Sequence, residues 1–206
     1  MQESAAPTDG RAARAARTRD AIVEASVALV EEGDVRPTAP RIAERAGVSV
    51  RSVFQHFDDL PTLYTAVVQR VVERLAVLVV SIDPDQPLDD RGVAFARHRG
   101  ALLEAVAPFR RAAAVHGPFA PSIGEAVTKG AAFLRGQVEA TFARELAQVP
   151  AGERRELVDA LAAAASWGMW DALRQDAAAA PDQAQAVLAR TLRSLLAGPA
   201  GPPRGA

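Results

Sequence analysis

The side chains best suited to binding a partner lie on the segment from Val50 to His56. Val53 and Phe57 are four residues apart, which places both on the inner side of a helix. A guanidinium can bond guanine O6 and N7 together, serine and glutamine can reach base edges, and valine can contact a thymine methyl group. The segment therefore predicts a helix that reads double-stranded DNA, with a phosphate contact as the alternative role for its arginine. The side chains expected to project outward are Val50, Arg51, Ser52 and Gln55.

A helix-turn-helix would position this segment. Thr38 can cap a first short helix, and Pro40 falls in the first turn of that helix, where a missing N–H is tolerated. Gly47 permits the positive φ that ends the first helix sharply. Ser49 can then cap the second helix, which runs to about His56. In this motif the second helix lies in the major groove of DNA.

Further basic residues surround the predicted motif. Residues 1–16 are expected to form a flexible basic arm, which can follow the minor groove or the phosphates, or remain a solvated tail. The segment 10–19 has no acidic residue and carries Arg11, Arg14, Arg17 and Arg19. On the first helix of the motif, Arg41 and Arg45 have a similar pair of interpretations, a contact with the DNA backbone or a solvated face.

Composition narrows the class of protein. The chain has 206 residues, of which 49% are hydrophobic and 24% charged, with a net charge of −1, so a basic face must be local. No apolar run reaches the length of a membrane span, and the N-terminus has no secretory signal pattern. The absence of cysteine is compatible with a cytoplasmic protein, and the three histidines lack a metal-ligand spacing. We expect no catalytic residue, no metal and no cofactor.

The apolar pattern is helical along the whole chain, which predicts an all-α fold with about nine helices. Residues 17–80 form the expected helix-turn-helix domain, whose last helix (59–80) connects it to a C-terminal domain at 81–198. The Gly- and Pro-rich residues 199–206 are expected to be disordered. The predicted helices span residues 18–32, 38–46, 49–56, 59–80, 90–107, 108–116, 122–149, 153–178 and 182–197.

Residues Thr18 to Val71 resemble the DNA-binding domain of the TetR-family transcriptional regulators. The order and spacing of the family consensus are kept in this segment, whereas the rest of the chain resembles the family only in being helical and of suitable length. The residues that carry the resemblance are Glu32-Gly33, Thr38, Ile42-Ala43, Ala46-Gly47-Val48-Ser49, Phe54-Gln55-His56-Phe57 and Leu63.

The resemblance implies DNA contacts for Thr38, Phe54 and His56, with two departures from the family pattern. Phe54 stands where the family usually has a tyrosine whose hydroxyl meets a phosphate, and Leu60 replaces a lysine near the DNA backbone. Each lost phosphate contact should flatten the salt dependence of binding by roughly one counterion. His56 would touch a phosphate, with a packing or capping role as the alternative.

The resemblance also implies a ligand cavity in the C-terminal domain and a homodimer through the helices at 153–178 and 182–197. Two tryptophans of the first of these helices are three residues apart, so one can pack inward while the other meets a partner subunit. For each candidate lining residue, ordinary core packing is the alternative. The candidates are Phe95, His98, Phe109, His116, Phe119, Phe133, Trp167 and Trp170.

Together these features predict a cytoplasmic, homodimeric repressor that binds an inverted-repeat DNA operator and is released by a small-molecule effector. One alternative is a helical protein of the same fold that serves as a protein-interaction or ligand-binding module with weak DNA binding. A helical enzyme or carrier is a further alternative, but the sequence shows no catalytic constellation, glycine-rich phosphate loop or metal cluster.

Overall fold

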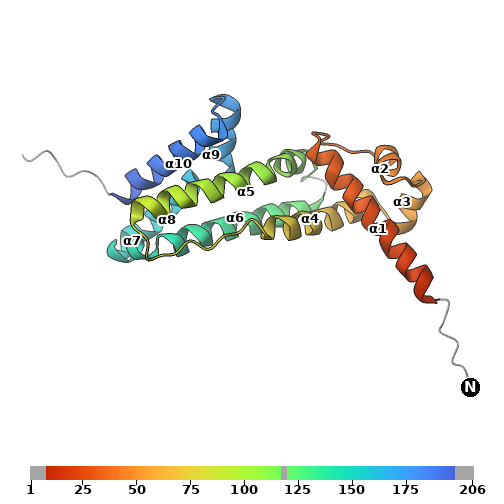
Figure 1. The fold of residues 1–206 in the computed structure, drawn as a ribbon, viewed down its shortest axis with the longest axis horizontal. Helices are drawn as coiled ribbons and strands as arrows, with labels where there is room; N and C mark the ends of the chain where they lie inside the picture. Colours follow the sequence, from red (N-terminus) through yellow and green to blue (C-terminus); the bar gives the residue numbers. More distant parts are fainter. Residues whose placement is uncertain (1–7, 117–119, 198–206) are drawn as a thin grey trace, which may run out of the picture. The chain divides into compact units, whose positions relative to one another are not determined.

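The computed structural model describes residues 8–116 and 120–197, and within them the secondary structure is helical (Figure 1). The all-α class predicted from the sequence is confirmed. The helices are α1 (Thr8–Glu31), α2 (Ala39–Ala46), α3 (Val50–His56), α4 (Leu60–Ala76), α5 (Leu88–His116), α6 (Pro121–Thr141), α7 (Ala143–Gln148), α8 (Ala151–Ala164), α9 (Trp167–Asp171), which continues into a π-helical turn (Ala172–Asp176), and α10 (Pro181–Leu196).

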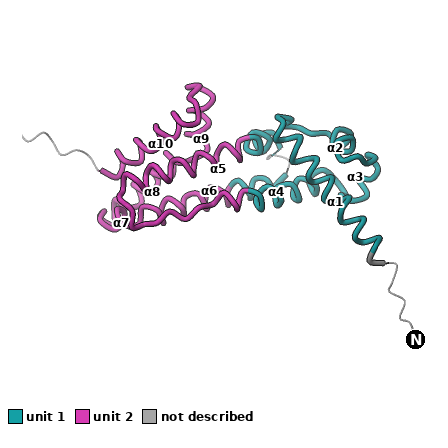
Figure 2. Tube along the Cα trace, in the orientation of Figure 1, with its two compact units in different colours: residues 1–74, 108–127 teal, residues 75–107, 128–206 magenta. Residues whose placement is uncertain are grey.

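The chain divides into two compact units, which Figure 2 distinguishes by colour. Unit 1 is the chain up to Arg74 together with Pro108–Val127, and unit 2 is Leu75–Ala107 together with the chain from Thr128 onward. The sequence predicted a single boundary after residue 80. That division is wrong, because the adjacent ends of α5 and α6 pack on α4. The ring of His116 lies 4.6 Å from that of Tyr64, centroid to centroid, and the Thr65 hydroxyl bonds the Ser122 hydroxyl at 2.9 Å.

Helix α1 begins far earlier than expected. The sequence predicted a flexible arm to residue 16, but residues 8–16 are helical. Alanine and arginine have high helix propensity, so the segment from Arg11 to Arg17 can extend the helix although it buries little. The predicted arm is therefore wrong for residues 8–16, and residues 1–7 lie outside the described part of the chain.

Three predicted boundaries in the C-terminal half also differ. Pro108 removes one backbone donor but lies inside the continuous helix α5. The predicted helix 122–149 is divided at Phe142, where ψ is 23°. The predicted helix 153–178 is divided at Ser166, whose Oγ accepts the Met169 N–H at 3.3 Å and caps α9. The predicted tail 199–206 lies outside the described residues.

The core of unit 1 is built from the inner faces of α1 to α4. Helix α1 packs against both α2 and α3, and these two pack against each other. Ser26 of α1 is polar but fully buried. Its burial is tolerated because its hydroxyl donates a hydrogen bond to the Ile22 carbonyl at 2.9 Å. The largest fully buried side chains of these helices and of the residue after α3 are Ile22, Val27, Ile42, Val53, Phe57 and Leu63.

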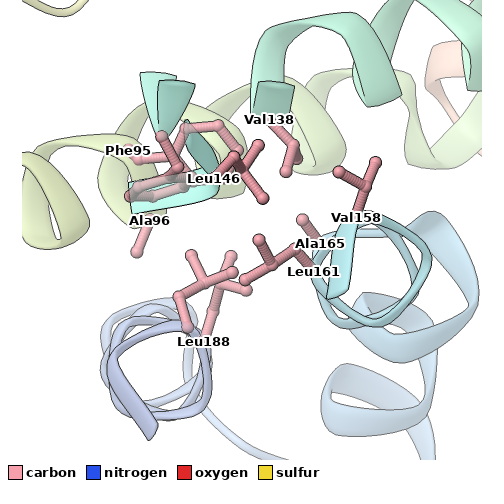
Figure 3. Close-up of a cluster of buried hydrophobic side chains, with 10 residues drawn as sticks. Phe95, Ala96, Val138, Leu146, Val158, Leu161, Ala165 and Leu188 are labelled. Atoms are coloured by element: carbon pink, nitrogen blue, oxygen red, sulfur yellow. The ribbon is translucent and has the colours of Figure 1, made fainter. Parts of the chain in front are cut away.

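Unit 2 has an apolar core between α5, α6, α7, α8 and α10 (Figure 3). The rings of Phe95 and Phe142 meet at 5.4 Å, an edge-tilted arrangement that aromatic pairs favour. A second cluster joins Leu103, Trp170 and Ala184. At position 100 only glycine fits without a clash, since a Cβ there would lie 2.7 Å from Cη2 of Trp170. The first cluster contains Phe95, Ala96, Val138, Phe142, Leu146, Val158, Leu161, Ala165, Leu188 and Leu192.

Candidate nucleic-acid interface

Helix α3 is held firmly on its inner side and at both ends. Val53 and the following Phe57 are each 1% exposed, so they anchor the helix in the core of unit 1. At its start, Ser49 Oγ accepts the Ser52 N–H at 3.1 Å. The turn before it is formed by Gly47 at φ 68°, a left-handed conformation that favours glycine. The two short helices and the turn expected from the sequence are confirmed.

Arg19 of α1 holds the other end of α3. Its Nη1 donates to the His56 carbonyl at 2.8 Å, and its guanidinium lies 4.1 Å from the centroid of the Phe57 ring. Carbonyls of the last helical turn lack partners within the helix, and a positive charge there also interacts favourably with the helix dipole. The sequence assigned Arg19 to the basic segment 10–19, but these two contacts give it a structural role.

The outer face of α3 carries the side chains that the sequence singled out. Val50 is 39% exposed and Phe54 47% exposed, and Arg51 and Gln55 are exposed too. Ser52 and His56 are half-buried. In the described part of the chain, the structure shows no ion pair or hydrogen bond for the guanidinium of Arg51. The face therefore presents a positive charge, an amide and two apolar groups to a partner.

The arginines of α2 are, by contrast, engaged in ion pairs. Arg41 Nη1 lies 2.6 Å from Asp34 Oδ2. Arg45 bonds both carboxylate oxygens of Glu32, at 2.7 and 2.5 Å, and this hydrogen bonding raises the pKa of Arg45 and lowers that of Glu32. A DNA phosphate would have to compete with these carboxylates. Thr38, at the start of α2, is exposed and makes no side-chain capping bond, so its hydroxyl is available.

Near the start of α4 the local charge is negative. Asp59 caps this helix, because its Oδ1 accepts the Thr62 N–H at 2.8 Å. Hydrogen bonding from Thr62 lowers the pKa of Asp59, which keeps it charged. Leu60, which replaces the basic residue of the family pattern, is half-buried. This end of α4 therefore offers no cation to a phosphate.

A cavity of about 410 Å³ lies within unit 2, between the segment that follows α4, α5 and α6. Its volume falls within the range of about 300–1,000 Å³ that is usual for small-molecule sites. Among the predicted ligand residues, Phe95, His98 and Phe133 line it. The sequence missed the polar lining from Arg99, Gln137 and Thr141, which lie on the inner sides of α5 and α6.

The other predicted ligand residues do not line this cavity. Phe109 and His116 belong to unit 1, where His116 Nε2 bonds the Val35 carbonyl at 3.0 Å and the ring packs on Tyr64. Trp167 and Trp170 belong to the second cluster of unit 2, and Trp170 Nε1 donates to Glu104 at 2.7 Å. None of these four residues lines this cavity. Phe119 lies outside the described residues.

Within residues 8–116 and 120–197, no helix is long and apolar enough to cross a membrane. Over the same ranges, no group of three or more histidine, aspartate or glutamate side chains is placed to hold a metal ion.

Several solved structures share this fold. A transcriptional regulator from Rhodococcus sp. Rha1 is 20% identical, with a TM-score of 0.61, over 89% of this chain and 96% of that one. A protein assigned to the TetR family of transcriptional regulators, from Mesorhizobium loti MAFF303099, is 21% identical, with a TM-score of 0.63, over 89% and 97%. A protein from Pseudomonas aeruginosa PAO1, assigned as a transcriptional regulator, is 20% identical, with a TM-score of 0.61, over 87% and 90%.

These likenesses extend over nearly the whole chain. The chain therefore has the fold of the TetR-family transcriptional regulators. Comparison of the sequence with models of protein families and with curated proteins gives no match.

Proposed function

We propose that this protein is a DNA-binding transcriptional regulator of the TetR family, and a repressor. The proposal rests on how α3 is held in unit 1 and on which of its faces is exposed. Its inner side is fixed by Val53 and Phe57, its ends are bonded by Ser49 and Arg19, and its outer face is exposed. A rigid, exposed helix after a tight turn is what major-groove recognition requires. Such a regulator acts in the cytoplasm, which is the location expected from the sequence.

Arg51 is the residue we assign to base recognition. It is exposed, and the described residues give its guanidinium no acidic partner, so binding DNA need not break an existing ion pair. A bidentate contact with guanine contributes about 1–3 kcal/mol of discrimination against the wrong base. The neighbouring assignments are Val50, Ser52 and Gln55 for base edges, and Thr38, Phe54 and His56 for the backbone. Arg41 would contact the backbone only after releasing Asp34.

The test uses duplexes selected from a random pool and fluorescence anisotropy at two salt concentrations. Arg51→Ala should weaken binding of the selected sequence about 5- to 150-fold, from the value above, and relax preference at one base pair. Arg97→Ala, which removes an exposed arginine of α5, is the matched control and should bind as the parent does. If Arg51→Ala keeps both affinity and preference, the assignment of α3 as the reading helix is wrong.

The proposal includes a homodimer, as the sequence suggested, formed through the outer faces of α8 and α10. Their inner faces are used within the chain, where Leu161 and Ala165 pack with Leu188 and Leu192. On the outer side of α10, Val187 remains 38% exposed. A dimer would present two copies of α3 to half-sites about one DNA turn, roughly 34–36 Å, apart, so the operator should be an inverted repeat.

Sedimentation velocity tests the dimer. Val187→Asp should shift the parent dimer to monomer, because a carboxylate would be buried at the interface. Val93→Asp, which changes an equally apolar and more exposed valine of α5, is the control and should leave the mass unchanged. A monomeric parent protein, or a Val187→Asp protein that stays dimeric, contradicts this part of the proposal.

Effector-dependent release is the last part of the proposal. A ligand of the cavity in unit 2 would shift DNA binding only if it prefers one of two arrangements of the chain. Two continuous helices, α5 and α6, contribute residues to both units, so a change at the cavity can be transmitted along the backbone. Operator affinity should change when a confirmed cavity ligand is titrated. Constant affinity at saturating ligand would exclude the coupling but not the DNA binding.

A further inference from the structure

Arg99 has an unusual environment for an arginine. It is 3% exposed and lies on α5 among apolar side chains, with its guanidinium 4.6 Å from the centroid of the Phe95 ring. Its hydrogen-bond partners are all neutral. Nη1 donates to the Ala165 carbonyl at 2.9 Å, and Nη2 donates to the Leu134 carbonyl at 2.9 Å and to Gln137 Oε1 at 3.3 Å.

The positive charge of Arg99 therefore has no carboxylate beside it in the described chain. Burial lowers the pKa of Arg99 to about 10, so the side chain is still protonated near pH 7 but its charged form is destabilised. A buried charge without a partner is costly, and such charges in proteins are normally paired or bound to an ion. Arg91 of the same helix shows the usual solution, since it is 2% exposed and is paired with Glu145.

The cavity of unit 2 is where a partner for this charge can reach it. Arg99 lines the cavity, and no aspartate or glutamate is found in the described lining. His98, Gln137 and Thr141 add hydrogen-bonding groups to the lining, and Gln137 bonds Arg99 directly. An anion entering here would meet a buried cation without displacing a protein carboxylate.

Apart from Ser81, the remaining lining is apolar, and several of its side chains are partly exposed. Leu78 is 37% exposed, Val79 38% and Phe133 49%, and Ile82 and Leu102 also line the cavity. This surface favours a hydrocarbon or aromatic body, whereas a small inorganic anion would leave it in contact with water. The lining thus combines one buried cation with an apolar wall.

We infer that the cavity binds a small amphipathic carboxylate, with the carboxylate beside Arg99 and the apolar body along α5, α6 and the segment that follows α4. The Nε–H of Arg99 has no acceptor in the described residues and can donate to the carboxylate, and charge-assisted bonds of this kind are stronger than neutral ones. The inference rests on the proposed function only in treating this cavity as the effector site. Binding itself can be measured without DNA.

The experiment uses the purified full chain and paired probes in which a neutral amide of nearly the same shape replaces the carboxylate. Isothermal titration measures octanoate against octanamide and 2-naphthoate against 2-naphthamide. At least one carboxylate should bind ten-fold or more tightly than its amide. Equal binding within both pairs, tighter binding of the amides, or no binding of any probe would overturn the inference.

Substitutions locate the site. Arg99→Gln should weaken the favoured carboxylate ten-fold or more and leave its amide unchanged, while Arg99→Lys should retain part of the preference. Arg97→Gln removes an exposed arginine two residues away and should change nothing. If Arg99→Gln does not fold, the paired probes on the parent protein still decide the question. A parent preference for carboxylate that survives in folded Arg99→Gln contradicts the assignment.

A separate operator measurement distinguishes this inference from the proposed function. Carboxylate binding that leaves DNA affinity unchanged would refute effector-dependent release but keep the inference. If a neutral ligand of the cavity releases DNA and none of the carboxylate probes binds, the proposed function stands and the inference is refuted.

Discussion

Replacing Arg19 by methionine should destabilise unit 1, although this arginine lies on the exposed surface of α1. Methionine keeps much of the apolar stem but loses the bond to the His56 carbonyl and the contact with the Phe57 ring. A net hydrogen bond contributes about 1 kcal/mol and an exposed cation–π contact about 0.5–1 kcal/mol. Allowing for solvent screening of the exposed guanidinium, we expect a loss of about 1–2 kcal/mol in the free energy of unfolding.

The matched control is Arg14→Met, five residues and about one and a half turns earlier on the same helix. The side chain of Arg14 is exposed, and the described residues give its guanidinium no partner. Both variants lose one positive charge, so both can reduce the salt dependence of DNA binding by roughly one counterion. Only Arg19→Met should also loosen the end of α3. Arg19→Lys, which keeps the charge, should lie between Arg19→Met and the parent.

Thermal unfolding followed by circular dichroism measures the difference. For a chain of this size, 1 kcal/mol corresponds to about 2–4 °C, so Arg19→Met should lower Tm by about 2–8 °C. Arg14→Met should leave Tm within about 1 °C of the parent, as surface substitutions away from specific contacts usually do. Equal Tm values for the two variants would show that the contacts of Arg19 do not stabilise α3, and would return it to a general role in phosphate binding.

Two further predictions concern unit 2. Gly100→Ala should cost about 1–3 kcal/mol, because the new Cβ would lie 2.7 Å from the buried ring of Trp170, whereas Gly92→Ala, with open space around it, should be neutral or stabilising. Chemical denaturation compares the two, and equal stability would show that the ring can move. Glu145→Gln should cost about 2–3 kcal/mol at pH 7, since it leaves buried Arg91 without its carboxylate. Burial raises the pKa of Glu145, but bonding to Arg91 outweighs this and lowers the pKa below 4.5, so the stability difference from the parent should shrink as pH falls from 7 to 3. A constant difference would contradict this account.

The helix-turn-helix was predictable because its determinants are local. Gly47, Ser49 and the spacing of Val53 and Phe57 specify a turn, a cap and a buried side within a few residues. The fold class followed in the same way from periodicity along the whole chain. The boundary between the two units could not be predicted from periodicity, because it depends on which helices the ends of α5 and α6 contact. No local pattern in the sequence predicts that the ring of Tyr64 packs against that of His116.

The candidate ligand residues show the same limit. Large aromatic side chains were natural candidates, but Trp167 and Trp170 are used in packing, and the polar side of the cavity comes from Arg99. A signal for Arg99 was present in the sequence. It lies four residues after Phe95 and three before Leu102, so the helical period places a charge among apolar side chains. Whether a carboxylate faced it could be learned only from the tertiary structure.

For a chain with 24 basic residues, all arginine except Lys129, and a net charge of −1, charge alone cannot identify a binding site. An anionic partner gains most from a cation that has no carboxylate of its own, because no existing ion pair must be broken. Arg41 and Arg45 fail this criterion on α2, although they lie beside the reading helix. Arg51 and Arg99 meet it, one exposed on α3 and the other buried at a cavity. This difference in burial is why we assign a solvated polyanion to Arg51 and a small, partly apolar anion to Arg99.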